Sequence, residues 1–130
     1  MILLDTHAVL WLLGTPERLS VAASRALEDA ALAGRALALS CLSLYEIAYG
    51  VARRRIIIHK SIESFLAEVE SELLILPVTR SIAIAAAGLI SPFPGDLFDR
   101  VIAATALTEG IPLITADERI RQSGVVRTIW

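Results

Sequence analysis

The chain alternates short apolar runs with stretches in which apolar residues recur at helical spacing, and this alternation limits the possible folds more than any other feature. The apolar runs are rich in Leu, Ile and Val and lack polar alternation, which is typical of strands buried on both faces of a parallel sheet. Five such strands are predicted, at Met1–Asp5, Ala36–Ser40, Leu73–Val78, Pro112–Thr115 and Val125–Ile129. Helices are predicted between them at about His7–Leu13, Val21–Ala33, Leu44–Arg54, Ile62–Glu72, Ser81–Ile90 and Asp99–Glu109, with a short turn at Glu118–Gln122. This order predicts an α/β fold, with a five-stranded parallel sheet between helical layers.

Length and composition indicate one domain, residues 1–130, that does not cross a membrane. A chain of 130 residues is long enough to bury a substantial core. Although 55% of the residues are hydrophobic and the mean hydropathy is +0.66, no apolar run approaches the roughly 18 residues of a membrane span. The apolar start, Met1–Leu4, lacks a basic region and meets Asp5 too soon to be a signal peptide. We therefore expect a cytoplasmic protein whose surplus apolar surface is covered by a partner or a second copy.

Charge and cysteine content narrow the possible chemistry. The formal net charge is −2, so no global basic field indicates nucleic-acid binding. Of the 12 Lys and Arg residues only Lys60 is a lysine, and arginine is the cation that prefers bidentate contacts to phosphate and carboxylate. The single cysteine, Cys41, excludes an intramolecular disulfide and any cysteine-cluster metal site.

Acidic residues follow the predicted strands at the edge of the sheet where open parallel folds bind ligands. Asp5 ends the first strand, and Glu46 lies in the first turn of the helix after the second strand. Asp99 opens the helix in the stretch GDLFDRVIAATA, three residues after Asp96, and Asp117 follows the fourth strand. We expect Asp5, Glu46, Asp99 and Asp117 to converge at this edge although they are far apart in the sequence.

Each acid also has an explanation as a helix cap. Asp5 precedes a helix, and Ser43 with Glu46 fits the S-x-x-E capping box. Asp96 or Asp99 can cap the helix that follows, and Asp117 can cap the turn after the fourth strand. Capping explains the acids one at a time and leaves their convergence unexplained.

Convergence of carboxylates indicates a cation. Two carboxylates about 4 Å apart repel by roughly 4 kcal/mol at an effective dielectric constant of about 20, so several together either protonate or bind a cation. Oxygen-rich sites suit Mg²⁺ or Mn²⁺, and His7 and His59 lack the spacing of ligands for a softer metal. Such an ion activates water and stabilises a phosphoryl group under attack. The chain has no glycine-rich phosphate loop, nucleophile elbow or His–Ser or His–Cys pattern.

Five motifs in order cover nearly the whole chain: LLDTHAVLW, S-x-x-S-x-Y-E-I-A, D-x-x-D-R-V-I-A-A-T-A, L-I-T-A-D and V-x-T-I-W. Together they resemble the PIN-domain ribonucleases, and most closely the VapC-type toxins of bacterial toxin–antitoxin pairs. The resemblance implies a three-layer α/β/α domain with a five-stranded parallel sheet and a magnesium-dependent acidic pocket. It also implies hydrolytic endoribonuclease activity on RNA.

The resemblance assigns roles to individual residues. Asp5 and Asp99 match the direct metal ligands, Glu46 completes or orients the site, and Asp117 binds a second ion or holds a water. Four further residues are assigned supporting roles: Thr6, Asp96, Arg100 and Thr115. The threonines are expected to hydrogen-bond the carboxylates or the phosphate. The chain departs from the family at Tyr45, where relatives usually have Trp, and at Leu97, where they often have Pro.

The expected partners are RNA, an antitoxin and a second copy of the chain. RNA needs local cations on an acidic protein, and the candidates are Arg53–Arg55, Arg100, Arg119 and Arg121. A solvated helix end is the favoured explanation for part of Arg53–Arg55, and Arg100 can instead pair with a neighbouring acid. VapC-like proteins form homodimers and are silenced by a cognate antitoxin that covers a hydrophobic groove and the active site. The surface around Leu10–Leu13 and Tyr49–Ile58 can supply that groove, although core packing is the favoured explanation for Trp11 itself.

Two other functions fit part of the same sequence pattern. An aspartyl phosphoryl-transfer protein needs a lysine near the phosphoryl group, but Lys60 lies on the wrong segment and no second Asp follows two residues after Asp5. A non-catalytic PIN-like module that only binds RNA or a protein would not need the four intact acids.

Overall fold

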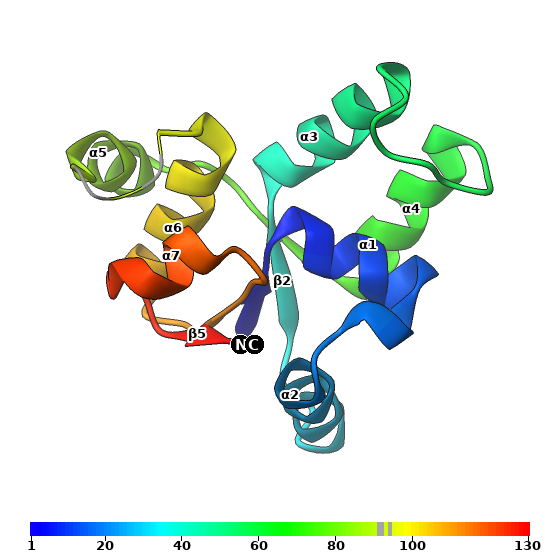
Figure 1. Ribbon diagram of the computed structural model, residues 1–130, viewed down its shortest axis with the longest axis horizontal. Coiled ribbons are helices and arrows are strands. Elements are labelled where there is room, and N and C mark those ends of the chain that lie inside the picture. The colour runs from blue at the N-terminus through cyan, green and yellow to red at the C-terminus, as the bar shows by residue number, and fades with distance from the viewer. Residues whose placement is uncertain (91–92, 94) are drawn as a thin grey trace.

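The computed structural model describes residues 1–90, 93 and 95–130, and in this part of the chain the strands form one parallel sheet (Figure 1). The sheet has five strands in the order β3-β2-β1-β4-β5. They are β1 (Ile2–Leu4), β2 (Leu37–Ser40), β3 (Leu74–Leu76), β4 (Leu113–Ile114) and β5 (Thr128–Ile129). Each lies within its predicted range, so the predicted five-stranded parallel sheet is confirmed.

The helices agree with the sequence prediction in number and order, apart from one added turn. They are α1 (Thr6–Gly14), α2 (Val21–Leu32), α3 (Cys41–Ala52), α4 (Ile62–Glu72), α5 (Arg80–Gly88), α6 (Leu97–Glu109) and α7 (Glu118–Ser123). The added element is the 3₁₀ turn η1 (Pro16–Arg18), which has a proline at its start. No helix within the described residues combines the length and the apolar character that crossing a membrane requires.

Helices cover both faces of the sheet, so the predicted three-layer α/β/α arrangement is confirmed. Figure 1 shows α1, α2 and α4 on one side of the sheet and α5, α6 and α7 on the other. Side chains alternate along β1: Leu4 packs in the core beneath the first group of helices, and Leu3 packs beneath the second. Neighbouring strands repeat this, with Leu39 and Ile114 on the side of Leu4. Both faces are therefore apolar, which explains the lack of polar alternation in the strand sequences.

Strand order brings the candidate site together. The chain adds β2 and then β3 on one side of β1, then crosses over to place β4 and β5 on the other. Leu4 is in register with Leu39 of β2 and with Ile114 of β4. The residue that follows β1 therefore lies between the ends of two neighbouring strands. The order of the strands reverses at this point, and ligands bind at such switch points in open parallel sheets.

Candidate active site

Acidic side chains from separate elements line one cleft at the switch point, which we call the acidic cleft. The cleft has a volume of about 380 Å³, and the described residues that line it are Asp5, Thr6, His7, Trp11, Glu46, Asp96, Asp99, Ile102, Ala116 and Asp117. The four acids predicted from the strand ends are all among them. They come from the end of β1, from α3, from α6 and from the end of β4, so the fold produces a convergence that the linear sequence only implies.

Asp5 is held rigidly at the end of β1. Its backbone N–H donates to the carbonyl of Ile114 at 3.0 Å, which extends the sheet by one residue. Its side-chain Oδ1 accepts the N–H of Ala8 at 2.7 Å and caps α1. The Thr115 hydroxyl also hydrogen-bonds to this carboxylate. Asp5 is therefore a helix cap and also a wall of the cleft.

Glu46 reaches the acidic cleft from the second turn of α3, and the capping-box explanation for it is wrong. The helix begins at Cys41, and its cap is Ser40, whose hydroxyl accepts the N–H of Leu42 at 3.3 Å. Ser43 is thus inside the helix, where its hydroxyl lies 2.9 Å from that of Thr6. Because Glu46 is not needed as a cap, its carboxylate is available to the cleft, where the nearby Thr6 hydroxyl acts to lower its pKa.

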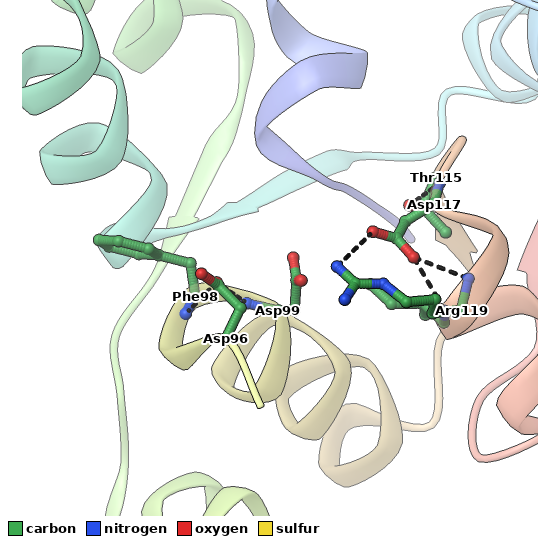
Figure 2. Close-up of polar contacts among 7 residues, drawn as sticks. Asp96, Phe98, Asp99, Thr115, Asp117 and Arg119 are labelled. Atoms are coloured by element: carbon green, nitrogen blue, oxygen red, sulfur yellow. Dashed lines mark hydrogen bonds and ion pairs between the residues drawn. The ribbon is translucent and has the colours of Figure 1, made fainter. Parts of the chain in front are cut away.

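Asp96 and Asp99 divide two tasks at the start of α6. Asp96 caps the helix: its Oδ1 accepts the N–H groups of Phe98 at 2.9 Å and of Asp99 at 3.1 Å. Asp99 makes no capping bond, and in Figure 2 its carboxylate projects from α6 into the space between Asp96 and Asp117. Of the two acids proposed as caps of this helix, only Asp96 is one.

Asp117 lies on the far side of the cleft, at the start of α7. Its Oδ1 accepts the N–H groups of Arg119 at 2.8 Å and of Ile120 at 3.1 Å, and its own N–H donates to the Thr115 hydroxyl at 3.1 Å. The Arg119 guanidinium folds back over it, with Nη2 3.8 Å from Oδ2 (Figure 2). This guanidinium is a cation beside the acids, and its side chain is still 69% exposed.

The carboxylates carry negative charge that the protein neutralises poorly. Burial raises the pKa of Asp5, and hydrogen bonds from Thr115 and Ala8 offset this only in part. Burial also raises the pKa of Glu46. Burial, followed by repulsion from Asp96 and Asp117, raises the pKa of Asp99 to about 7, although the Arg119 guanidinium acts to lower it. A bound cation would relieve both the repulsion and the desolvation.

The donor chemistry of the acidic cleft fits a hydrated Mg²⁺ better than an enclosed ion. In the part of the chain that the structure describes, no group of three or more His, Cys, Asp or Glu side chains is placed to hold a metal ion. Asp5, Asp96 and Asp117 each direct an oxygen to the start of a helix, which fixes them around the cleft. Mg²⁺ usually retains several waters and is held by one or two carboxylates together with substrate phosphates, which suits such an open arrangement.

Arg100 lies outside the acidic cleft despite its position beside Asp99. Its guanidinium donates to the backbone carbonyl of Leu89, just after α5, and the residue is not among those that line the cleft. Successive residues of a helix are rotated by about 100°, so neighbours in sequence face different directions. The structure therefore gives Arg100 a contact between α5 and α6.

Two cleft residues, His7 and Trp11, were not assigned to the site from the sequence. They lie one turn apart on α1, with ring centroids 5.9 Å apart, and both line the cleft. Trp11 is only partly buried and also packs against Trp130, with ring centroids 5.4 Å apart, so the expectation of core packing for it was wrong. The sequence did contain a signal for both residues. They follow Asp5 by two and six positions, in a helix that begins at the site.

A second hollow, which we call the α1 groove, adjoins the acidic cleft and shares His7 and Trp11 with it. It has a volume of about 590 Å³ and lies between α1 and the segment that joins α3 to α4. Its walls include apolar Leu10, Leu13 and Ile57. Its remaining walls include the cations Arg18, Arg55 and Lys60.

A parallel α/β domain with an acidic cleft at the switch point is the architecture that the sequence motifs predicted. The family model described as PIN domain matches residues 2–125, and the chain belongs to this family. It is 37% identical over 131 residues to Ribonuclease VapC22 of Mycobacterium tuberculosis, an alignment that covers 99% of this chain and 98% of that protein. The recognition of the PIN-domain family from five motifs is therefore confirmed.

Solved structures of other bacterial proteins share the fold. VapBC2 from Rickettsia felis, crystallised with a promoter DNA fragment, matches with a TM-score of 0.72 and 22% identity over 98% of this chain and 97% of that chain. FitAcB from Neisseria gonorrhoeae matches with a TM-score of 0.65 and 23% identity over 98% of this chain and 96% of that chain. At these identities the similarity establishes the three-layer fold.

Proposed function

We propose that this protein is a Mg²⁺-dependent endoribonuclease and the toxin of a VapBC-like toxin–antitoxin pair. The observation that carries the proposal is the convergence of carboxylates from four elements on one cleft at the switch point of the sheet. Similarity along almost the whole chain to a protein named Ribonuclease VapC22 supports RNA as the substrate. Since its substrate is cellular RNA, we place the protein in the cytoplasm.

The carboxylates have distinct roles in this proposal. Asp5 and Asp99 hold Mg²⁺, with Mn²⁺ as a substitute, and Glu46 orients the site from α3. Asp117 holds a water or a second ion. When bound, Mg²⁺ activates a water and stabilises the charge of a phosphoryl group under in-line attack. Asp5 suits its role because Oδ1 accepts the Ala8 N–H, which fixes the carboxylate at the wall of the cleft.

Thr6, Thr115 and Arg119 support these acids. The Thr115 hydroxyl joins Asp5 to the backbone N–H of Asp117, so the ends of β1 and β4 are held in one arrangement. The Thr6 hydroxyl, which donates to that of Ser43 at 2.9 Å, joins α1 to α3 beside Glu46. Arg119 lies at the exposed side of Asp117, where its guanidinium can contact a phosphate that enters the cleft. We assign Asp96 to capping α6 and, through its charge, to raising the pKa of Asp99.

The α1 groove is the surface we propose for the antitoxin. Its apolar walls and cations would accept a segment that carries apolar and acidic residues, and its junction with the cleft would let the same segment block RNA. We also infer a homodimer. Large apolar side chains elsewhere remain exposed, including Ile84 at 68% and Ile90 at 79%, and a second copy would cover such surface.

The test of the proposed activity is cleavage of an RNA pool by the purified chain, free of antitoxin, with Mg²⁺ and with a chelator. We expect cleavage by wild type only with Mg²⁺, and loss of cleavage in Asp5→Asn and Asp99→Asn. Asp29→Asn is the matched control, because Asp29 is an exposed residue of α2. Equal cleavage by all four proteins would show that Asp5 and Asp99 do not carry the activity. No cleavage by wild type would leave a non-catalytic PIN-like module as the function.

A further inference from the structure

Three aromatic rings and one guanidinium form a row that begins beside the acidic cleft, which we call the aromatic strip. The strip consists of Phe98, Tyr45, Tyr49 and Arg53. The ring centroids of Phe98 and Tyr45 are 6.2 Å apart, and those of Tyr45 and Tyr49 are 5.7 Å apart. The Arg53 guanidinium lies 3.9 Å from the centroid of the Tyr49 ring. The row is therefore continuous from the start of α6 to the end of α3.

The helical repeat explains the row and fixes it to the site. Tyr45, Tyr49 and Arg53 are four residues apart and so share one face of α3. Tyr45 directly precedes Glu46, which lines the acidic cleft. Phe98 directly precedes Asp99, and Figure 2 shows its ring extending to the side of α6 away from Asp117. The strip thus leads away from the carboxylates along α3.

These rings are exposed in a way that folding alone does not explain. The exposed fraction is 58% for Tyr45 and 37% for Tyr49, while Phe98 is half-buried. Arg53, Arg54 and Arg55 are all exposed at the far end of the strip. Rows of aromatic rings beside cations are how proteins bind single-stranded nucleic acid, because bases stack on the rings and phosphates contact the cations.

We propose that the aromatic strip stacks the bases of single-stranded RNA next to the bond that is cut, a role that rests on the proposed ribonuclease function. Unpaired bases offer free faces to the Tyr45 ring and to Tyr49 with the Arg53 guanidinium stacked on it, whereas bases within a duplex do not. Stacking also supplies affinity to a protein whose net charge is −2, for which attraction to phosphates is weak. Arg53 adds a phosphate contact at the end of the strip. The aromatic strip is a positioning surface, and the acids of the cleft remain the catalytic residues.

The test uses a random-sequence single-stranded RNA pool, with duplex RNA of the same length as a second probe. The Tyr45→Ala/Tyr49→Ala variant is compared with Tyr45→Trp/Tyr49→Phe, which keeps the rings. Binding is measured with a chelator present, so that no cleavage is required, and steady-state cleavage is measured separately with Mg²⁺. Leu32→Ala, at an exposed apolar residue of α2, is the matched control for loss of apolar surface.

We expect the alanine variant to bind single-stranded RNA at least about tenfold more weakly and to show a raised KM with kcat within about twofold of wild type. Duplex binding should not change, and the ring-keeping variant should behave as wild type. Wild-type affinity and KM in the alanine variant would overturn the proposal. So would a loss of binding that accompanies dissociation into monomers in sedimentation, which would identify the strip as a subunit interface.

The two proposals fail separately in this experiment. If the wild type never cleaves RNA yet binding still depends on the rings, the ribonuclease function fails and the stacking surface stands. If the wild type cleaves RNA and the rings make no difference, only the stacking surface fails.

Discussion

The acidic cleft and the α1 groove share the side chains of His7 and Trp11, yet their other walls carry opposite charge. Five carboxylates line the cleft, while the described residues that line the groove include Arg18, Arg55 and Lys60 and no carboxylate. The cleft therefore repels a polyanion unless a cation is bound, and the groove attracts acidic and apolar groups without one. Two neighbouring hollows on one small domain thus suit different ligands.

The difference arises from where each hollow lies in the fold. The cleft forms where strands end and helices begin, so Asp5, Asp96 and Asp117 cap helices and line the site at the same time. The groove forms between the side of α1 and a connecting segment, where apolar residues lie beside exposed cations. Separate functions for the two surfaces predict that substitutions in one leave the activity of the other intact.

The largest expected effect is on cleavage. Asp5→Asn or Asp99→Asn removes a charge that we assign to Mg²⁺ binding, and cleavage should fall at least about 100-fold. Ile57→Asp in the α1 groove should leave the cleavage of free RNA within about twofold of wild type, because this residue is not part of the cleft. Initial rates on a labelled RNA pool provide the measurement. A similar loss of cleavage in all three variants would contradict the expectation that the cleft and the groove have separate functions.

The next effect is on the antitoxin. Ile57 is 81% exposed in the groove, so Ile57→Asp should fold normally while it places a charge in the apolar contact. We expect antitoxin affinity to fall about 10- to 30-fold, the scale of a well-packed interface residue. Leu32→Asp, on α2 outside the groove, is the control with comparable exposure at 88%. Calorimetry with the cognate antitoxin measures the affinity of each variant. Equal affinity of Ile57→Asp and Leu32→Asp for the antitoxin would show that the groove is not part of the interface.

A smaller effect concerns stability without metal. The pKa of Asp99 is raised from 3.8 in the unfolded reference to about 7, so the folded state binds this proton more tightly. The free energy of unfolding should then fall as the pH rises from about 4 to about 7, and should not change further from this group above that range. Asp99→Asn should remove this dependence and stabilise the metal-free protein at pH 8 by at most about 1 kcal/mol, because the group is partly exposed.

Urea unfolding with a chelator present, at pH 5 and pH 8, tests this expectation. Asp29→Asn is again the control and should keep the wild-type dependence on pH. If the wild type is more stable at pH 8 than at pH 5, and Asp99→Asn removes this increase, the assigned direction of the pKa shift is wrong.

The smallest effect is expected at the exposed side of the cleft. Arg119→Gln removes the guanidinium that lies 3.8 Å from Asp117 and acts to lower the pKa of Asp99. Since its side chain is 69% exposed, the free energy of unfolding should change by less than about 0.5 kcal/mol. Because the pKa of Asp99 is then higher, the pH range over which the free energy of unfolding falls should extend to higher pH. A downward extension would show that Arg119 does not act on the cleft acids.

The fold was predictable because its signals are local. Apolar runs without polar alternation identified the strands, and acids after them marked the edge where β1 and β4 end. Parallel strands bring their ends together, so the position of Asp5, Glu46, Asp99 and Asp117 followed from the fold class. The sequence also allowed Asp5 and Asp117 to act as caps, and the structure gives both residues that contact in addition to their place in the cleft.

The direction of individual side chains was less predictable. Both Ser40 and Ser43 are acceptable caps, and only the end of β2 at Ser40 decides between them. Arg100 was expected beside the acids because it follows Asp99, but the rotation of α6 directs it to the carbonyl of Leu89. The place of Trp11 depends on Trp130, more than a hundred residues away in the sequence, which periodicity within one helix does not reveal.

The central claim is that the carboxylates of the acidic cleft bind a divalent cation, and direct binding of Mn²⁺ tests it. Electron paramagnetic resonance of free Mn²⁺ gives the affinity of wild type, Asp5→Asn, Asp99→Asn and Asp29→Asn at pH 6 and pH 8. Wild type and Asp29→Asn should bind Mn²⁺, more tightly at pH 8 because Asp99 has then lost its proton, while Asp5→Asn and Asp99→Asn should bind at least about tenfold more weakly. Equal affinity in all four proteins, or no binding by wild type, would contradict the account.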